Sequence, residues 1–455
     1  MTMTIKNKTI SLLNILVAPI KRYAIPALLV VLLFGQSVTA QDRVITLDEA
    51  LKLGLDNSNV VKLSTAKVDQ AISQFNQAKD GAMPTGKASF AYNRAEIPAN
   101  TLQLGSTKLG LPKSADAFLG IASLNEVIFG ANKLKYAEQS TELLTQVARL
   151  DVDNSRDEIA YDIISSYYDL YKVLQSKKVV EQNLTAVDQQ IKQAQRFFDQ
   201  GIVTKNDVLR FQLQRANIEL NAIDLETNRK IVNYNLDVLL GLPETTQLMI
   251  NALTEDNKQL QPLSAYVDTA LAARPELRQL DLRNKVAEVN IKNIRANTSP
   301  TLAASAGLYY VDVSADPLPQ SGKFITPVTI GLTFGWNFST LWTNKNKVTE
   351  AKIEQDEVTL NKAITINNVK KEVNQDYQNY LMALDKIKLL QTSIEQAGEN
   401  NKILESKYKS NIASATDRAD AETLLYQAEI NLELAKADAG LAYYTLIKST
   451  GKLNK

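Results

Sequence analysis

The 455-residue sequence contains no cysteine and no histidine. Without cysteine the chain has no disulfides and no thiol chemistry, and without histidine it lacks the commonest general base and a common metal ligand. Lysine and arginine together number 51, against 50 aspartates and glutamates, so the chain also lacks the basic excess that nucleic-acid binding requires. We therefore expect no enzyme activity, no metal, no cofactor and no nucleic-acid partner.

Long apolar runs are also missing, except near the N-terminus. Four basic residues precede the apolar run 24–34, and Ala40 ends a Val-Thr-Ala motif that is typical of a signal-peptide cleavage site. We expect residues 1–40 to be a secretory signal peptide, because a transmembrane anchor, the alternative, needs about 20 apolar residues. No second apolar run of that length follows, so an exported chain of this kind could enter a membrane only through strands.

Segment 326–339 has the clearest strand pattern of the chain. Its apolar residues alternate strictly with threonine, glycine and asparagine, which predicts a strand with one apolar face. Three further strands are expected at 88–97, 117–128 and 301–313, all long enough to cross a bilayer at a tilt of about 45°. We expect one face of segment 326–339 to contact lipid, namely Val328, Ile330, Leu332, Phe334 and Trp336. Aromatic residues near the strand ends predict an aromatic girdle at the membrane surface, with a buried aromatic cluster as the alternative; they are Phe129, Trp336, Phe338 and Trp342.

Long helices are expected between these strands. The first should cover 47–79, and residues 131–200 contain neither glycine nor proline, so that a helix there could be about 105 Å long. The helix returning over 202–240 has apolar residues at heptad spacing, namely Leu209, Leu213, Ala216, Leu220 and Ile223. Such spacing predicts that the long helices pack against each other as coiled coils.

The chain contains two copies of one plan, helix, strand, loop, strand, very long helix, tight turn and returning helix. A heptad seam in the first copy recurs 210 residues later; its two versions are Val180, Leu184, Val187, Ile191, Ala194, Phe198 and Leu390, Ile394, Ala397, Asn401, Leu404, Tyr408. RFFDQGIVTKNDVL also aligns with YKSNIASATDRA, which places Gly201 over Asn411 and Asp207 over Asp417. The long helices of the second copy are expected at 342–410 and 414–448.

This duplication defines the expected domains and the fold class. We place the first repeat at 41–243, a linker at 244–262 and the second repeat at 263–455. Four strands per chain cannot close a membrane barrel, because known barrels begin at about eight strands, so several chains must share one. The expected fold is therefore mainly α-helical, with long antiparallel coiled-coil helices forming a tunnel and four strands per protomer in a shared membrane β-barrel.

Over essentially the whole mature chain, the sequence resembles the TolC-like outer-membrane factors, the exit ducts of bacterial efflux pumps and type I secretion systems. The resemblance rests on the duplicated plan, the opening ITLDEALKLGL, the F-x-x-x-G-x-x-[ST]-x-x-D turn and the segment NLDVLLGLP. It implies a homotrimer with one twelve-stranded barrel, placed in the outer membrane of a Gram-negative bacterium and extending into the periplasm. It also implies a periplasmic adaptor protein and an inner-membrane transporter of RND, ABC or MFS type. A periplasmic coiled-coil spacer without a pore is the alternative function.

The two tight turns are the expected contacts with the adaptor. They are Gly201-Ile202-Val203 and Asn411-Ile412-Ala413. Exposed apolar residues at a hairpin tip suit a docking surface, although they can also staple the turn itself. Asn411 stands where the resemblance implies glycine, and asparagine tolerates the left-handed backbone that such a turn needs.

We expect acidic residues beside these turns to line the periplasmic entrance of the duct. Asp417 and Asp420 are three residues apart and so share one helix face, which threefold symmetry would turn into two acidic rings. The resemblance also implies cation-binding aspartates there. The alternative for Asp417 and Asp207 is a capping-box role with Ser414 and Thr204.

Tyr408 lies on the seam just before the second turn. It could add a hydrogen bond to a closed entrance, or it could serve in packing.

Overall fold

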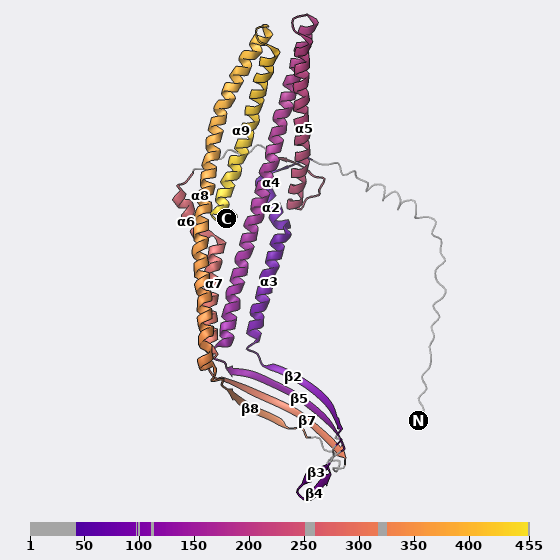
Figure 1. Ribbon diagram of the computed structural model, residues 1–455, viewed down its shortest axis with the longest axis vertical. Coiled ribbons are helices and arrows are strands. Elements are labelled where there is room, and N and C mark those ends of the chain that lie inside the picture. The colour runs from indigo at the N-terminus through magenta and orange to yellow at the C-terminus, as the bar shows by residue number, and fades with distance from the viewer. Residues whose placement is uncertain are drawn as a thin grey trace, which may run out of the picture.

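The computed structural model describes residues 42–96, 98, 101–110, 113–250, 260–316 and 325–453. The signal peptide expected at 1–40 therefore lies outside the described residues. Long helices form one part of an elongated molecule, and a curved sheet forms its other end (Figure 1). Among the described residues, no helix is both long and apolar enough to cross a membrane.

The first long helix expected from the sequence is two helices. Strand β1 (Asp42–Ile45) leads into α2 (Leu47–Asn57) and α3 (Asn59–Asp80). The prediction of one helix over 47–79 is wrong because Ser58 has a non-helical ψ of 119° and its hydroxyl accepts a hydrogen bond from the Val61 amide. Ser58 therefore ends one helix and caps the next.

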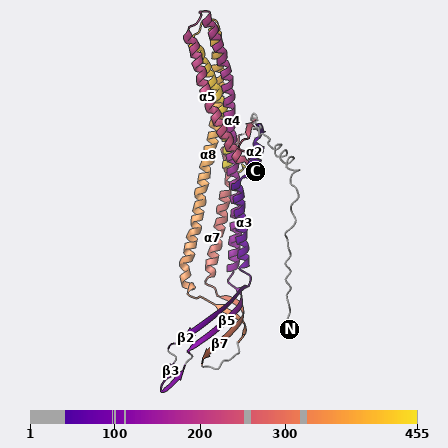
Figure 2. The same ribbon diagram turned by 90° about the vertical axis from the view of Figure 1, so that its right-hand side faces the viewer.

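Two long hairpins dominate the helical part. The first consists of α4 (Lys133–Asp199) and α5 (Lys205–Leu240), and the second of α8 (Thr340–Lys409) and α9 (Ala415–Ser449). With 67 residues, α4 is about 100 Å long. Figures 1 and 2 show both hairpin tips at the end of the molecule opposite the sheet. The shorter helices α6 (Leu263–Ala273) and α7 (Pro275–Ala296) pack on α8, and α7 also packs on α4.

The four expected strands form one antiparallel sheet. They are β2 (Thr85–Glu96), β5 (Ser114–Phe129), β7 (Thr301–Asp316) and β8 (Val328–Gly335), in the order β2-β5-β7-β8. Strand β8 is shorter than the expected segment 326–339, because the chain turns after Gly335 toward α8. Trp336 is therefore not part of the strand, and its indole nitrogen donates to the Thr298 carbonyl at 3.0 Å.

The structure contains two short strand pairs that the sequence analysis did not predict. β3 (Thr101–Leu104) and β4 (Thr107–Gly110) form a hairpin between β2 and β5. β6 (Gln247–Ile250) lies in the segment expected as a linker and pairs in parallel with β1. Ile45 of β1 and Leu248 of β6 are fully buried in the main hydrophobic core, together with Ile163 of α4 and Leu240 of α5. This core lies where α2, α4 and the end of α5 meet.

The coiled-coil seam expected in α4 is buried within the chain, and the seam expected in α5 is not. Val180, Val187 and Ala194 of α4 are buried as expected. The expected α5 seam is not covered within the chain: its four large residues are at least half exposed, at 50% for Leu209, 64% for Leu213, 60% for Leu220 and 63% for Ile223. In this part of α5 the buried residues are instead Val208, Phe211 and Ile218. The helix therefore has two apolar stripes, and α4 covers only one of them.

Candidate functional site

The two hairpin tips have the same backbone geometry. Gly201 has φ of 70°, and the Ile202 amide donates to the Phe197 carbonyl at 2.8 Å. Asn411 has φ of 59°, and the Ile412 amide donates to the Lys407 carbonyl at 2.8 Å. Each turn therefore ends its helix with a left-handed residue and a carbonyl satisfied from beyond the helix end. The predicted left-handed Asn411 is confirmed.

Both returning helices begin with a capping box. The Asp417 carboxylate accepts from the Ser414 amide at 3.0 Å and from its hydroxyl at 2.7 Å, and the Asp417 amide donates back to that hydroxyl. Asp207 accepts from the amide and hydroxyl of Thr204 at 2.8 and 2.7 Å. The hydroxyl and amide of Ser414 hold the pKa of the Asp417 carboxyl below its usual value. Asp417 therefore remains negatively charged at neutral pH.

Tyr408 joins the two tips. It is 4% exposed and packs against Phe197 of α4 and Phe211 of α5, with ring centroids 6.0 and 5.9 Å away. Its hydroxyl is buried and has no hydrogen-bond partner among the described residues. Burial, and then the negative charge of Asp207, raise the pKa of Tyr408. Within a single chain, Tyr408 therefore serves in packing, and the hydrogen-bonding capacity of its hydroxyl is not used by the described residues.

The two aspartates of the predicted acidic rings differ in their contacts. Both Asp417 and Asp420 are exposed, and only Asp417 takes part in the capping box. Between them lies Arg418, which is 6% exposed, pairs with the equally buried Glu422 at 2.8 Å and donates to the side chain of Asn401. Sequence analysis missed this buried pair, although Asn401 interrupts an apolar seam and Arg418 and Glu422 have the i,i+4 spacing of a helical ion pair.

The tips also expose large apolar side chains. Ile202 is 43% exposed and Ile412 is 75% exposed. Val203 and Ala413 are half-buried, and Ala413 packs into the cluster around Tyr408. One isoleucine on each turn is therefore available to a partner, while the next residue supports the turn.

The strand register separates the sheet into two unlike faces. Tyr92 lies opposite Phe118, and Leu308 lies opposite Val328, so these residues share the face that carries Ile330, Leu332 and Phe334. That face is largely apolar and highly exposed, with Ile330 at 87%, and it also carries Glu126. The other face carries small and polar residues on all four strands, together with Leu119, Ile121 and Val311; the small and polar residues are Ser89, Asn93, Ser123, Asn125, Ser305, Gly307, Thr329, Gly331 and Thr333. Such alternation is typical of a strand between lipid and water.

The apolar face ends in a group of charges at the far end of β2 and β5. Arg94 pairs with Glu96 at 2.9 Å and with Asp116 at 3.6 Å, and the Tyr92 hydroxyl donates to Asp116 at 2.8 Å. These residues share the face of Phe118. A tyrosine followed by charged residues is typical of a strand at the interface between the hydrocarbon layer of a membrane and water.

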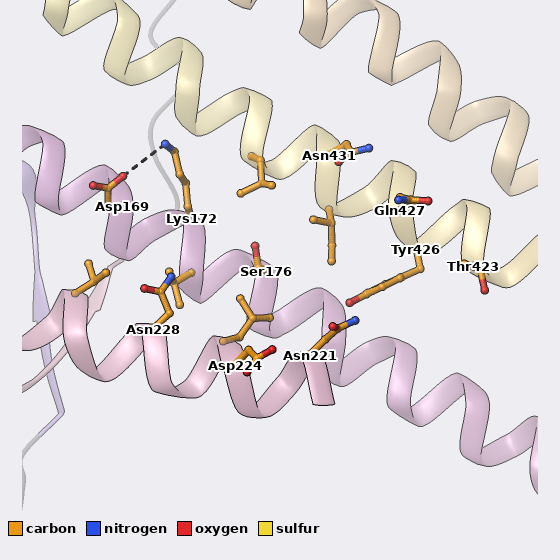
Figure 3. Close-up of a pocket in the computed structure, with 15 residues that line it drawn as sticks. Asp169, Lys172, Ser176, Asn221, Asp224, Asn228, Thr423, Tyr426, Gln427 and Asn431 are labelled. Carbon is orange, nitrogen blue, oxygen red and sulfur yellow. Dashed lines mark ion pairs between the residues drawn. The ribbon is translucent and has the colours of Figure 1, made fainter. Parts of the chain in front are cut away.

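A polar groove separates the two hairpins. Its volume is about 880 Å³, and α4, α5 and α9 line it (Figure 3). Amide and hydroxyl residues recur at heptad spacing on its walls, as Asn221 and Asn228 do on α5. Lys172 on one side pairs with Asp169 at 3.5 Å and with Asp438 of α9 at 2.7 Å. Polar side chains therefore share the groove between the hairpins with apolar ones such as Val173, Leu225 and Ile430.

Comparison with known proteins identifies relatives along most of the chain. Residues 266–452 match the family described as outer membrane efflux protein. The outer membrane efflux protein BepC of Brucella suis is 23% identical over 93% of this chain and 89% of its own. The outer membrane protein TolC of Escherichia coli is 19% identical, covering 87% of this chain and 80% of its own. The Campylobacter jejuni CmeC outer membrane channel has the same fold, with a TM-score of 0.74 and 16% identity over 90% of this chain and 86% of that one.

These comparisons confirm the resemblance to the TolC-like outer-membrane efflux proteins. They also confirm the expected location in the outer membrane of a Gram-negative bacterium, with an extension into the periplasm. The relatives are channel proteins rather than enzymes.

Proposed function

We propose that this relative of the TolC-like outer-membrane efflux proteins is a homotrimeric exit duct that passively conducts substrates from an inner-membrane transporter, in a tripartite efflux pump or a type I secretion system. The internal duplication into residues 41–243 and 263–455 supplies two similar wall segments per chain. Three chains would then complete a barrel of twelve strands and a helical tunnel.

The observation that carries this proposal is that the four-stranded sheet has two unpaired edge strands, β2 and β8. Within the described strands, β2 and β8 each have one unpaired edge. They run in opposite directions, because three antiparallel pairings separate them. β8 of one copy can therefore pair antiparallel with β2 of the next, which removes both edges.

The helical part has matching open edges. α4 packs on both α5 and α9, and α9 packs on α8, so the wall has the order α5, α4, α9, α8. The α5 stripe that α4 leaves uncovered, from Leu209 to Ile223, is exposed. In its half near the tip, α8 exposes a similar stripe at heptad spacing, formed by Met382, Leu389 and Ile403. Head-to-tail contact of α5 with α8 of the next copy would bury both stripes and close a ring.

The tips would then form the periplasmic entrance. Three copies of Asp417 and Asp420 would surround the axis, and a confined mouth lined with carboxylates favours cations. Ile202 and Ile412 would provide an apolar contact for the adaptor.

Replacing the α5 edge tests this proposal. The double variant Leu213→Asp, Leu220→Asp should lose the heat-stable trimer, because it places six carboxylates in the contact between copies. The matched control Leu213→Met, Leu220→Met keeps the stripe apolar and should keep the trimer. Gel mobility and light scattering of the purified protein give the result, and trimers at the native yield in the double variant would contradict this interface.

A further inference from the structure

The β3–β4 hairpin lies beyond the end of the sheet farthest from the helices (Figures 1 and 2). Leu102 lies opposite Leu109, and Leu104 lies opposite Thr107. Gly105, with φ of 63°, is the first residue of its two-residue turn, where a type II′ turn favours glycine. The hairpin is thus a defined element rather than an irregular loop.

This hairpin has one apolar face that nothing in the described chain covers. Leu102, Leu104 and Leu109 share that face and are 46%, 65% and 52% exposed. Gln103 and Lys108 are paired on the opposite face. An isolated two-stranded hairpin is marginally stable in water, so its leucine face needs a partner while its polar face remains in solvent.

Lipid does not suit this leucine face. The membrane-facing side of the sheet ends at the charged group of Arg94, Glu96 and Asp116. Glu96 and Ser114 form the last pair of β2 and β5, and the hairpin is attached outside that pair. The three leucines therefore lie farther from the helices than the charged residues that end the lipid-facing surface. At that position they are outside the layer of acyl chains.

The hairpin can instead reach the axis of the proposed duct. A twelve-stranded barrel with strands about 4.8 Å apart and tilted by about 45° has a radius of about 13 Å. The four residues between Glu96 and Thr101 can span up to about 14 Å, and a four-residue strand adds about 13 Å. Three hairpins attached to the rim can thus meet over the opening.

We propose that the leucine faces of the three β3–β4 hairpins pack against one another over the outer mouth of the duct and restrict it. The occupant of each leucine face is the same face on the two other copies. This inference rests on the proposed homotrimer. It assigns to Leu102, Leu104 and Leu109 a closing contact at the end of the duct opposite the acidic tips.

Single cysteines test the packing, because the chain has none of its own. In trimers treated with a mild oxidant, Leu104→Cys should form covalent dimers, since three apolar faces that meet bring these positions within disulfide range. Lys108→Cys, on the outer face of the same hairpin, is the matched control and should form few. Leu102→Cys repeats the test at the neighbouring position. Intact trimers with no crosslink at 102 or 104, or with equal crosslinking at 108, would overturn the inference.

Conductance gives an independent result. The variant Leu102→Ser, Leu104→Ser, Leu109→Ser should form normal trimers and raise single-channel conductance by about twofold or more, because the outer restriction is removed. Unchanged conductance in normal trimers would contradict a closing role. A bilayer-confined quencher that reaches a fluorophore at Leu104→Cys would show that lipid is the occupant and would also overturn the inference. Loss of the trimer in the unmodified protein would instead refute the proposed function.

Discussion

Gly201 and Asn411 share a left-handed backbone conformation, with φ of 70° and 59°, although 210 positions separate them. Each is followed by an isoleucine amide that bonds back to a carbonyl near the end of the preceding helix. Three residues farther on, each returning helix begins with a hydroxyl residue and an aspartate in a capping box. The two tips are therefore the same structure built from different residues.

The first prediction concerns this turn. Asn411→Val should lower the free energy of unfolding by about 1 to 2 kcal/mol, because a β-branched residue is strained at positive φ. Asn411→Gly and Gly201→Asn should both be tolerated, because each gives one tip the residue of the other. Thermal or denaturant unfolding of the mature protein measures the difference, and equal stability of Asn411→Val and the native chain would contradict the role of the left-handed residue.

The second prediction concerns the two faces of β8. Leu332→Arg should cost as much as about 2 to 4 kcal/mol and reduce the yield of heat-stable trimers, because it places a charge on the lipid-facing side of the strand. Thr333→Arg, its neighbour on the opposite face, should fold and change the conductance. If both arginines left trimer yield unaltered, the assignment of faces from the strand register would be wrong.

The third prediction concerns the adaptor. Cysteines at Val203 or Ala413, fitted with a short crosslinker, should capture a periplasmic partner in cells, because each lies next to an exposed isoleucine at a tip. Gln103→Cys, in the hairpin at the other end of the molecule, is the control and should capture none. Capture only from the strand end would reverse the proposed orientation.

The fourth prediction concerns Asp237, which is fully buried at the end of α5. Burial raises the pKa of its carboxyl from 3.8 to about 6. One carboxylate oxygen has no partner in the part of the chain that the structure describes, and the other accepts from Asn233 at 2.7 Å. The folded chain therefore holds the proton more tightly than the unfolded chain. This group should lower the free energy of unfolding as the pH rises from about 4 to about 6, with no further loss at higher pH.

Asp237→Asn should remove that loss and stabilise the chain at pH 7.5 by about 1 to 3 kcal/mol. Asp224→Asn, an exposed aspartate of the same helix, is the control and should have little effect. Unfolding measured from pH 4 to pH 8 decides the matter. A variant that is no more stable at pH 7.5, or that keeps the native pH dependence, would show that Asp237 is not a buried carboxylate at neutral pH.

Much of the fold follows from local patterns in the sequence. Strict alternation around Leu332 predicts the strand, and a long stretch without glycine or proline predicts α4. The capping residues Ser414 and Asp417 can be read directly from their spacing. These features depend on neighbours along the chain, and so they are visible without the fold.

Other features depend on distant partners and could not be predicted in this way. Leu213 and Ile218 are equally apolar, and only the position of α4 decides that Ile218 is buried and Leu213 exposed. The pairing of β6 with β1 joins segments about 200 residues apart. At the tips, the packing of Tyr408 against Phe197 and Phe211 depends on how the two hairpins meet.

Single-channel recording of the purified mature protein in planar bilayers tests the proposed trimeric duct most directly. We expect heat-stable trimers that insert and conduct in discrete, cation-selective steps, and we expect the variant Asp417→Asn, Asp420→Asn to conduct with lower cation selectivity. Unchanged selectivity in that variant would remove these two residues from the entrance. A purified chain that stays monomeric and leaves the bilayer without conducting steps would contradict the duct itself.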